Sequence, residues 1–328
     1  MPVPVLVAVG ALLSAALLIY WGSCIALFRH AFCRRTCQGR DRFRPDSPAL
    51  APYGEEIAEG IRRVDALPYE KLTITAADGI VLTARLYGGA DAPLTLLLFH
   101  GYRSFGACDF GGILWKYVEK KGYRVLLPDQ RAHGESGGRY ITFGIQERRD
   151  CAAWAFYLRD RFGPAHPLVL EGMSMGSATV LMAAGVPLPE TVTGIVADCG
   201  YTSPDAILRK VAGDMHLPAS LLLPGVYFLC RHVAHFDPLE TTAPAALAES
   251  DLPVLLIHGE GDDFVPCWMS EENYRACGSR GILLLIPGAT HAMSYFYDRE
   301  RVEQALYRFL TERMAAFACV QAEGGGKR

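Results

Sequence analysis

Short apolar runs alternate with longer amphipathic segments along most of the chain. Such runs are typical of buried strands, and we predict strands at residues 93–99, 123–127, 167–170, 194–198, 252–257 and 281–286. Helical spacing of the apolar residues between them predicts helices at 109–121, 145–161, 176–184, 267–277 and 295–317. An α/β fold with a mostly parallel central sheet flanked by helices follows from this alternation. Two earlier runs, 71–75 and 80–87, predict a hairpin.

The first part of the chain has a different pattern, because residues 2–28 contain no Asp, Glu, Lys, Arg or His. As a helix rising about 1.5 Å per residue, this segment would be roughly 40 Å long, enough to cross a hydrocarbon core of about 30 Å with tilt. A cleaved signal peptide is the alternative, but it would carry a basic residue ahead of a shorter apolar run. No Lys or Arg precedes this run. We therefore expect residues 1–28 to be a transmembrane anchor.

Basic residues follow the apolar segment directly, namely Arg29, Arg34, Arg35, Arg40, Arg42 and Arg44. The positive-inside rule places this flank in the cytoplasm, so we expect a single-pass membrane protein whose large C-terminal domain is cytoplasmic. The ten cysteines show no repeated spacing, which fits a reducing compartment. A net charge of −3 and the absence of a clustered basic groove argue against nucleic acid as a partner.

The rest of the chain divides by composition into a connector, a folded domain and a tail. Residues 29–67 are expected to form a juxtamembrane connector, because three prolines interrupt regular structure before a short amphipathic helix at 55–67. The alternating strands and helices place the domain at 68–318. The glycine-containing tail at 319–328 is expected to be flexible.

A serine between two glycines follows one of the predicted strands. Gly172-Met173-Ser174-Met175-Gly176 comes directly after the run at 167–170 and directly before an expected helix. A serine on so sharp a turn has a strained backbone, and its flanking glycines are needed because a Cβ there would clash. The turn would present the Ser174 hydroxyl at the positive N-terminus of the helix. This context, rather than the pentapeptide alone, indicates the nucleophile elbow of a serine hydrolase.

A serine hydroxyl needs a base within hydrogen-bond reach, and His291 is the candidate. It follows the last predicted strand by the short loop Pro287-Gly288-Ala289-Thr290, so it should lie at the same edge of the parallel sheet as Ser174. His100 and His258 also follow strands, but each precedes a glycine and is expected to shape a turn.

The base must in turn be oriented by an acid, and two adjacent aspartates compete for that role. Asp262 and Asp263 both follow the predicted strand at 252–257, at the same sheet edge. Acyl transfer also needs N–H donors for the developing oxyanion. We expect these to be the backbone amides of Met175, directly after the serine, and of Tyr102, in the loop after the strand at 93–99.

With these motifs in this order, residues 68–318 resemble the α/β-hydrolase superfamily, above all its esterase, lipase and serine-peptidase-like branch with membrane-anchored single-pass members. The segment from His258 to Pro266 is similar to the family pattern His-Gly-x-x-Asp-x-x-Val-Pro, which assigns the acid to Asp262 and leaves Asp263 as a loop or capping residue. The run from Asp129 to Ser136 is similar to a family loop that supports the site structurally.

The resemblance implies a serine hydrolase that cleaves carboxylic esters through Ser174, His291 and Asp262 and an acyl-enzyme, without a metal or organic cofactor. A thioesterase, lipase or peptidase would use the same residues, so the leaving group stays open. The alternative from another class is a non-catalytic membrane scaffold, which loss of a triad member would favour. His232 and His235 have helical spacing, but no third metal ligand is apparent.

The stretch between the predicted strand at 194–198 and the predicted strand at 252–257 is too long for a simple crossover. We expect residues 201–250 of this stretch to form a cap inserted over the site, with a helix at 203–215. The segment 217–236 is strongly apolar. One interpretation is that this face packs on the domain. The other is that it forms an apolar acyl pocket for a lipid-like ester, open toward the bilayer.

Overall fold

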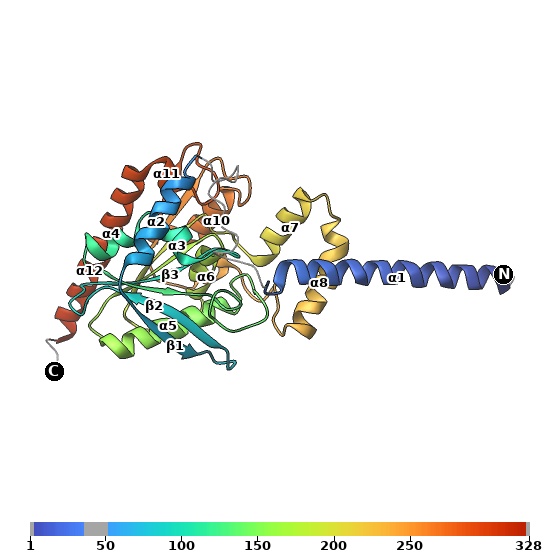
Figure 1. The fold of residues 1–328 in the computed structure, drawn as a ribbon, viewed down its shortest axis with the longest axis horizontal. Helices are drawn as coiled ribbons and strands as arrows, with labels where there is room; N and C mark the ends of the chain where they lie inside the picture. The colour runs from blue at the N-terminus through green and yellow to red at the C-terminus, as the bar shows by residue number, and fades with distance from the viewer. Residues whose placement is uncertain (1–2, 36–51, 326–328) are drawn as a thin grey trace.

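The computed structural model describes residues 3–35 and 52–325 of the chain (Figure 1). Its strands are β1 Tyr69–Thr75, β2 Val81–Tyr87, β3 Thr95–Phe99, β4 Arg124–Pro128, β5 Leu168–Met173, β6 Val192–Asp198, β7 Val254–Gly259 and β8 Gly281–Ile286. Its helices are α1 Val3–Phe32, α2 Gly54–Ala66, α3 Gly106–Phe110, α4 Leu114–Glu119, α5 Glu147–Phe162, α6 Met175–Ala183, α7 Pro204–Asp214, α8 Ala219–Val233, α9 Ala243–Ala248, α10 Trp268–Cys277, α11 Ser294–Tyr297 and α12 Arg299–Gly325.

The strands form one sheet in the order β1-β2-β4-β3-β5-β6-β7-β8. The predicted hairpin β1–β2 is antiparallel, and β2 also runs antiparallel to β4, whereas every pairing from β4 to β8 is parallel. The inner parallel strands have buried, branched sequences such as Thr95-Leu96-Leu97-Leu98-Phe99, because helices cover them on both faces, whereas the edge strand β8 is only partly buried. The predicted α/β architecture is confirmed.

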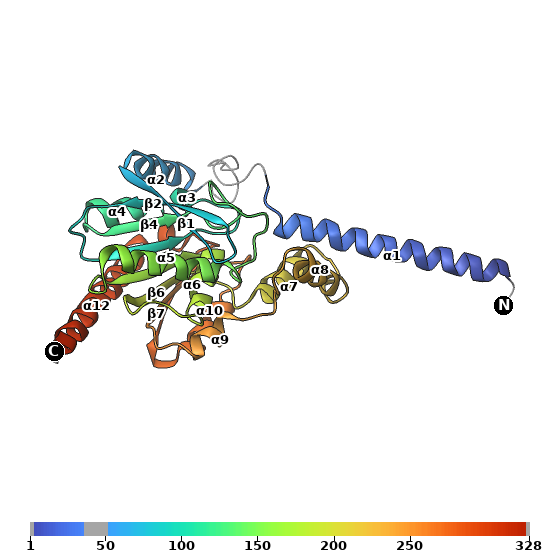
Figure 2. The ribbon, with the colours of Figure 1, turned by 90° about the horizontal axis from the view of Figure 1, so that it is seen from below.

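Helices cover the two faces of the sheet and give the domain two apolar cores (Figure 2). One core joins the sheet to α5, α6, α8, α9 and α10 and includes the fully buried Trp154. The other joins it to α2, α3, α4 and α12 and includes the fully buried Phe309. Because β3, β5, β6, β7 and β8 run parallel, their carboxyl ends lie at one edge of the sheet, and the predicted site residues follow these ends.

Two of the predicted helices are each divided in the structure. The helix expected at 109–121 is split into α3 and α4 at Gly111 and Gly112, where a Cβ on Gly112 would lie 2.6 Å from the Tyr295 ring. The helix expected at 295–317 is split at Asp298, whose carboxylate accepts a hydrogen bond from the amide of Arg301 and begins α12. Helix α12 then continues to Gly325, so the tail expected to be flexible is helical as far as that residue.

Helix α1 extends far from the domain, and only its C-terminal half is covered (Figure 1). There it lies beside α8: the thiol of Cys24 donates a hydrogen bond to the Leu222 carbonyl at 3.6 Å, and the ring centroids of Trp21 and Phe228 are 5.5 Å apart. Gly225 permits this approach, since a Cβ on it would lie 2.6 Å from the Cys24 sulfur. The apolar face of α8 thus packs partly on α1 rather than only on the domain.

Candidate active site

The turn between β5 and α6 presents Ser174. Its φ is +54°, a left-handed value that costs energy for a residue with a side chain, and its amide donates to the Asp198 carbonyl at 2.9 Å. Both flanking glycines are required. A Cβ on Gly172 would lie 2.2 Å from the Gly176 carbonyl oxygen, and one on Gly176 would lie 1.8 Å from that of Phe99.

Ser174, His291 and Asp262 form one hydrogen-bonded chain across three strand ends. The Ser174 Oγ lies 2.9 Å from His291 Nε2, and His291 Nδ1 lies 2.7 Å from Asp262 Oδ2. The Asp262 carboxylate is fully buried, whereas the His291 side chain keeps about a quarter of its surface exposed (25%). Asp263, the competing acid, is exposed. The structure therefore brings together the residues that the motif indicated, and it separates Asp262 from its neighbour.

The surroundings of Asp262 keep it ionised. Burial alone would raise its pKa, but hydrogen bonds from His258 and His291 outweigh burial, so the pKa of Asp262 lies below its usual value. The amides of Phe264 and Val265 donate to its other oxygen at 2.9 and 2.8 Å. His258 is buried 3.3 Å from the carboxylate and 2.6 Å from the Ser270 hydroxyl, so it supports the acid as well as the turn that the sequence indicated.

The loop after β3, which carries the expected oxyanion donor Tyr102, is fixed by a partly buried carboxylate. Asp109 accepts hydrogen bonds from the Gly101 amide at 2.6 Å and from the Ser104 hydroxyl at 2.5 Å. Burial raises the pKa of Asp109, although both hydrogen bonds oppose the rise. In the sequence, Asp109 stands only at the start of a predicted helix. Its single local signal was a carboxylate eight residues after the glycine of the loop, which is too weak to recognise alone.

The side chain of Tyr102 connects this loop to α1. Its hydroxyl donates to the Ala31 carbonyl at 2.8 Å, and its ring stacks on Phe143 with centroids 5.1 Å apart. The next residue, Arg103, has a φ of +54°, and its amide donates to His133 Nε2 at 2.9 Å. On the other side of the site, Met175 is the first residue of α6, so its amide has no carbonyl partner within the helix.

The supporting loop after β4 is held by buried polar contacts. Arg131 forms two hydrogen bonds of 2.6 Å with the Asp150 carboxylate, and Asp129 accepts from the Glu135 amide at 2.8 Å. Burial lowers the pKa of His133 well below its usual value, so this histidine is neutral and accepts the hydrogen bond of the preceding loop. Asp129, Arg131 and His133 therefore take the positions of supporting residues, as the sequence suggested.

A cavity of about 670 Å³ opens beside His291. Its walls are largely apolar, with Ile57 from α2, Met173, Phe264, Met293 and Phe296 among the lining residues. None of its lining residues belongs to the cap segment 201–250. The cap therefore does not form this cavity, and an acyl pocket under the cap stays a prediction. The apolar face of α8 lies beside α1, which was not foreseen.

One group of possible metal ligands overlaps the site. Cys199, Asp262 and His291 place donor atoms within 4.8 Å of one another. Cys199 is fully buried, and burial raises the pKa of its thiol well above the usual value. Both atoms that Asp262 and His291 would offer are already joined to each other or to Ser174. The donor set thus fits a hydrogen-bonded chain better than a metal centre.

Comparison with known proteins assigns the fold. Residues 95–219 match the model of the family described as the alpha/beta hydrolase fold. The esterase Pf2001 of Pyrococcus furiosus superimposes with a TM-score of 0.60 at 22% identity, over 79% of this chain and 94% of the esterase. The chain is an α/β-hydrolase-fold protein.

The curated relatives of this chain are distant in sequence. Protein YqkD of Bacillus subtilis, itself uncharacterized, is 25% identical over 258 residues, which is 78% of this chain and 83% of the relative. The bifunctional esterase/perhydrolase DCH of Acinetobacter calcoaceticus is 22% identical over 72% of this chain and 98% of the enzyme. Esterases among the neighbours support a hydrolase, and the reaction must be argued from the site itself.

Proposed function

We propose that the chain is a membrane-anchored serine hydrolase that cleaves carboxylic esters. The observation that carries this proposal is the hydrogen-bonded chain from the strained Ser174 through His291 to the buried Asp262. Buried polar chains of this order at the carboxyl edge of an α/β sheet are what acyl transfer requires. A non-catalytic scaffold would gain nothing from holding a serine at a φ of +54°.

In the proposed reaction His291 removes the proton of the Ser174 hydroxyl as its oxygen attacks the acyl carbon. The developing oxyanion is stabilised by the amides of Met175 and Tyr102, each such donor contributing about 3 kcal/mol. His291 then protonates the leaving alcohol, and Asp262 stabilises the imidazolium without taking its proton. A water molecule activated by His291 releases the acid from the acyl-enzyme. A thioester, lipid ester or peptide could enter the same sequence with a different leaving group.

A fluorophosphonate probe tests the activated serine. We expect the probe to label the natural chain in detergent micelles and to label neither Ser174→Ala nor His291→Ala, because the first removes the nucleophile and the second its base. Ser279→Ala, which removes an exposed serine, is the matched control and should be labelled like the natural chain. Absence of labelling in a chain shown by circular dichroism to be folded, together with no ester turnover when lipid is added, would favour the scaffold.

The apolar cavity beside His291 predicts a preference for acyl groups longer than acetyl. Each buried methylene contributes about 0.8 kcal/mol, so two of them raise kcat/KM roughly tenfold. We expect octanoyl esters to be cleaved more than tenfold faster than acetyl esters at low concentration. The variant Phe264→Ser should reduce this ratio, whereas Phe228→Ser, a matched change on the cap, should not; the two side chains are 45% and 47% exposed. Equal turnover of acetyl and octanoyl esters would contradict the pocket.

We further propose that α1 anchors the chain in a membrane with the hydrolase domain in the cytoplasm. By length and composition α1 can cross a bilayer, and its most apolar window is fully exposed, although a signal sequence would pass the same test. The arginines that follow its apolar part support the orientation. Resistance of the intact chain to carbonate extraction would distinguish an anchor from a removed leader.

A further inference from the structure

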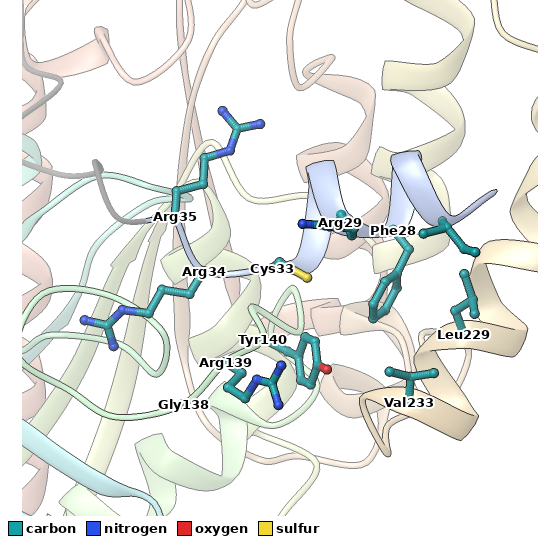
Figure 3. A pocket seen from close by; sticks show the side chains of 11 residues that line it. Phe28, Arg29, Cys33, Arg34, Arg35, Gly138, Arg139, Tyr140, Leu229 and Val233 are labelled. Carbon is teal, nitrogen blue, oxygen red and sulfur yellow. The ribbon is translucent and has the colours of Figure 1, made fainter. Parts of the chain in front are cut away.

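A pocket of about 630 Å³ lies where α1 meets the domain, apart from the cavity beside His291 (Figure 3). One side of it is apolar, with Phe28 from α1, Leu229 and Val233 from α8, and Tyr140, whose ring lies 5.6 Å from that of Phe28. The residues of the pocket do not include any member of the proposed catalytic chain. Its position and chemistry therefore call for a separate explanation.

The other side of the pocket carries arginines, which Figure 3 shows opposite Leu229 and Val233. Arg34 donates to the Ser136 and Gly134 carbonyls at 2.5 and 2.6 Å and so serves mainly to hold the chain. Arg29 and Arg139 are exposed, and neither forms an ion pair with a carboxylate among the described residues. Two guanidinium groups beside an apolar wall match an anionic head joined to a hydrocarbon tail.

The depth of the pocket relative to α1 identifies the source of such a molecule. Every residue from Val3 to Ile19 is exposed, a length of roughly 25 Å at 1.5 Å per residue, which is less than a hydrocarbon core of about 30 Å. A bilayer spanned by α1 must therefore reach the part of the helix beside α8. There Leu221, Phe228 and Val233 are exposed by 58, 47 and 46%, as expected for a surface in contact with lipid.

From these observations we propose that the pocket binds one anionic phospholipid. Its phosphate would lie between Arg29 and Arg139, and an acyl chain would lie along Phe28, Leu229 and Val233. The proposal rests on the proposed insertion of α1 in a membrane and not on the ester chemistry. Such a lipid would join α1, the cap helix α8 and the loop at Gly138-Arg139-Tyr140, and so would fix the domain against the membrane surface.

Native mass spectrometry of the full chain in detergent measures this binding. The probe is an ether-linked phosphatidylglycerol, which has no carboxylic ester to cleave, compared with ether-linked phosphatidylcholine and inorganic phosphate. We expect phosphatidylglycerol to bind at least tenfold more tightly than either, because only it offers both an uncompensated negative charge and a tail. Replacing Arg29 and Arg139 by glutamine should weaken it by about fivefold per arginine. The double variant Arg275→Gln/Arg308→Gln, which removes the same charge from exposed positions on α10 and α12, should bind like the natural chain.

A second variant, Val233→Asn, tests the apolar wall without disturbing the charges. Val233→Asn changes a half-exposed side chain and adds no charge, so the fold should persist, yet the variant should bind phosphatidylglycerol severalfold more weakly. Equal binding by the natural chain and the Arg29/Arg139 variant would overturn the proposal, as would phosphatidylcholine binding equal to that of phosphatidylglycerol. If inorganic phosphate bound as tightly as the lipid, the pocket would be a site for a free anion and the lipid proposal would be overturned. Carbonate extraction, measured separately, shows whether a failure lies in this site or in the membrane anchor.

Discussion

Replacing Asp262 by asparagine is expected to lower kcat for a chromogenic octanoyl ester by about 10⁴-fold, whereas Asp263→Asn should leave it within twofold. The physical reason is that the Asp262 carboxylate, 2.7 Å from His291 Nδ1, fixes the tautomer in which Nε2 faces Ser174 and can accept its proton. An amide at this position could donate to Nδ1 instead and favour the opposite tautomer. Asp263 is exposed and makes no such contact.

Two features make this pair of variants informative. Both substitutions remove one negative charge from adjacent positions, so a change in the overall electrostatic field would affect them equally. Hydrogen bonds from His258 and His291 also keep the pKa of Asp262 below its usual value, so the acid stays ionised through the whole assay range. The activities of the Asp262→Asn and Asp263→Asn variants are measured as steady-state ester turnover, with Ser174→Ala giving the background level. A loss in Asp263→Asn equal to that in Asp262→Asn would contradict the assignment of the acid.

The central sheet, and the three strand ends that carry the site residues, could be predicted because each strand is recognisable from its own short apolar run. Runs such as Leu168-Val169-Leu170 are buried on both faces and have no polar positions, so they identify strands without knowledge of their neighbours. Ser174 directly follows such a strand, and His291 follows the apolar strand β8 after a four-residue loop; parallel strands bring their carboxyl ends to one edge. Their juxtaposition therefore followed from chain order and strand direction alone.

Features that depend on packing between distant segments could not be predicted in the same way. Asp109 accepts the Gly101 amide from the short helix α3, and the break between α3 and α4 lies where Tyr295 closely approaches Gly112. Apolarity alone likewise could not tell that α8 lies against α1, because an apolar face is equally suited to a core, a helix or a substrate. The small residue Gly225 permits the contact between α8 and α1, and this role of Gly225 can be recognised only once both helices are placed.

A last buried carboxyl gives a prediction about stability rather than catalysis. Glu171 on β5 is fully buried, and its nearest donor is the Tyr117 hydroxyl at 3.2 Å. Burial raises its pKa to about 8, although the hydrogen bond from Tyr117 opposes the rise. Near pH 7 the folded chain therefore holds a proton on Glu171 that the unfolded chain, with an ordinary carboxyl, releases.

Glu171→Gln is accordingly expected to stabilise the protein at pH 7, by up to roughly 3 kcal/mol. The sign follows from the raised pKa: the natural carboxyl costs nothing below the unfolded pKa, and its cost grows as pH rises toward the folded value of about 8. A neutral amide keeps an acceptor for Tyr117 and has no such cost. Thermal unfolding in detergent at pH 4.5 and pH 7 measures the difference, with exposed Glu272→Gln as control. The Glu171 variant should gain several degrees at pH 7 and little at pH 4.5, and a lower midpoint than the natural chain at pH 7 would show that Glu171 is ionised and paired.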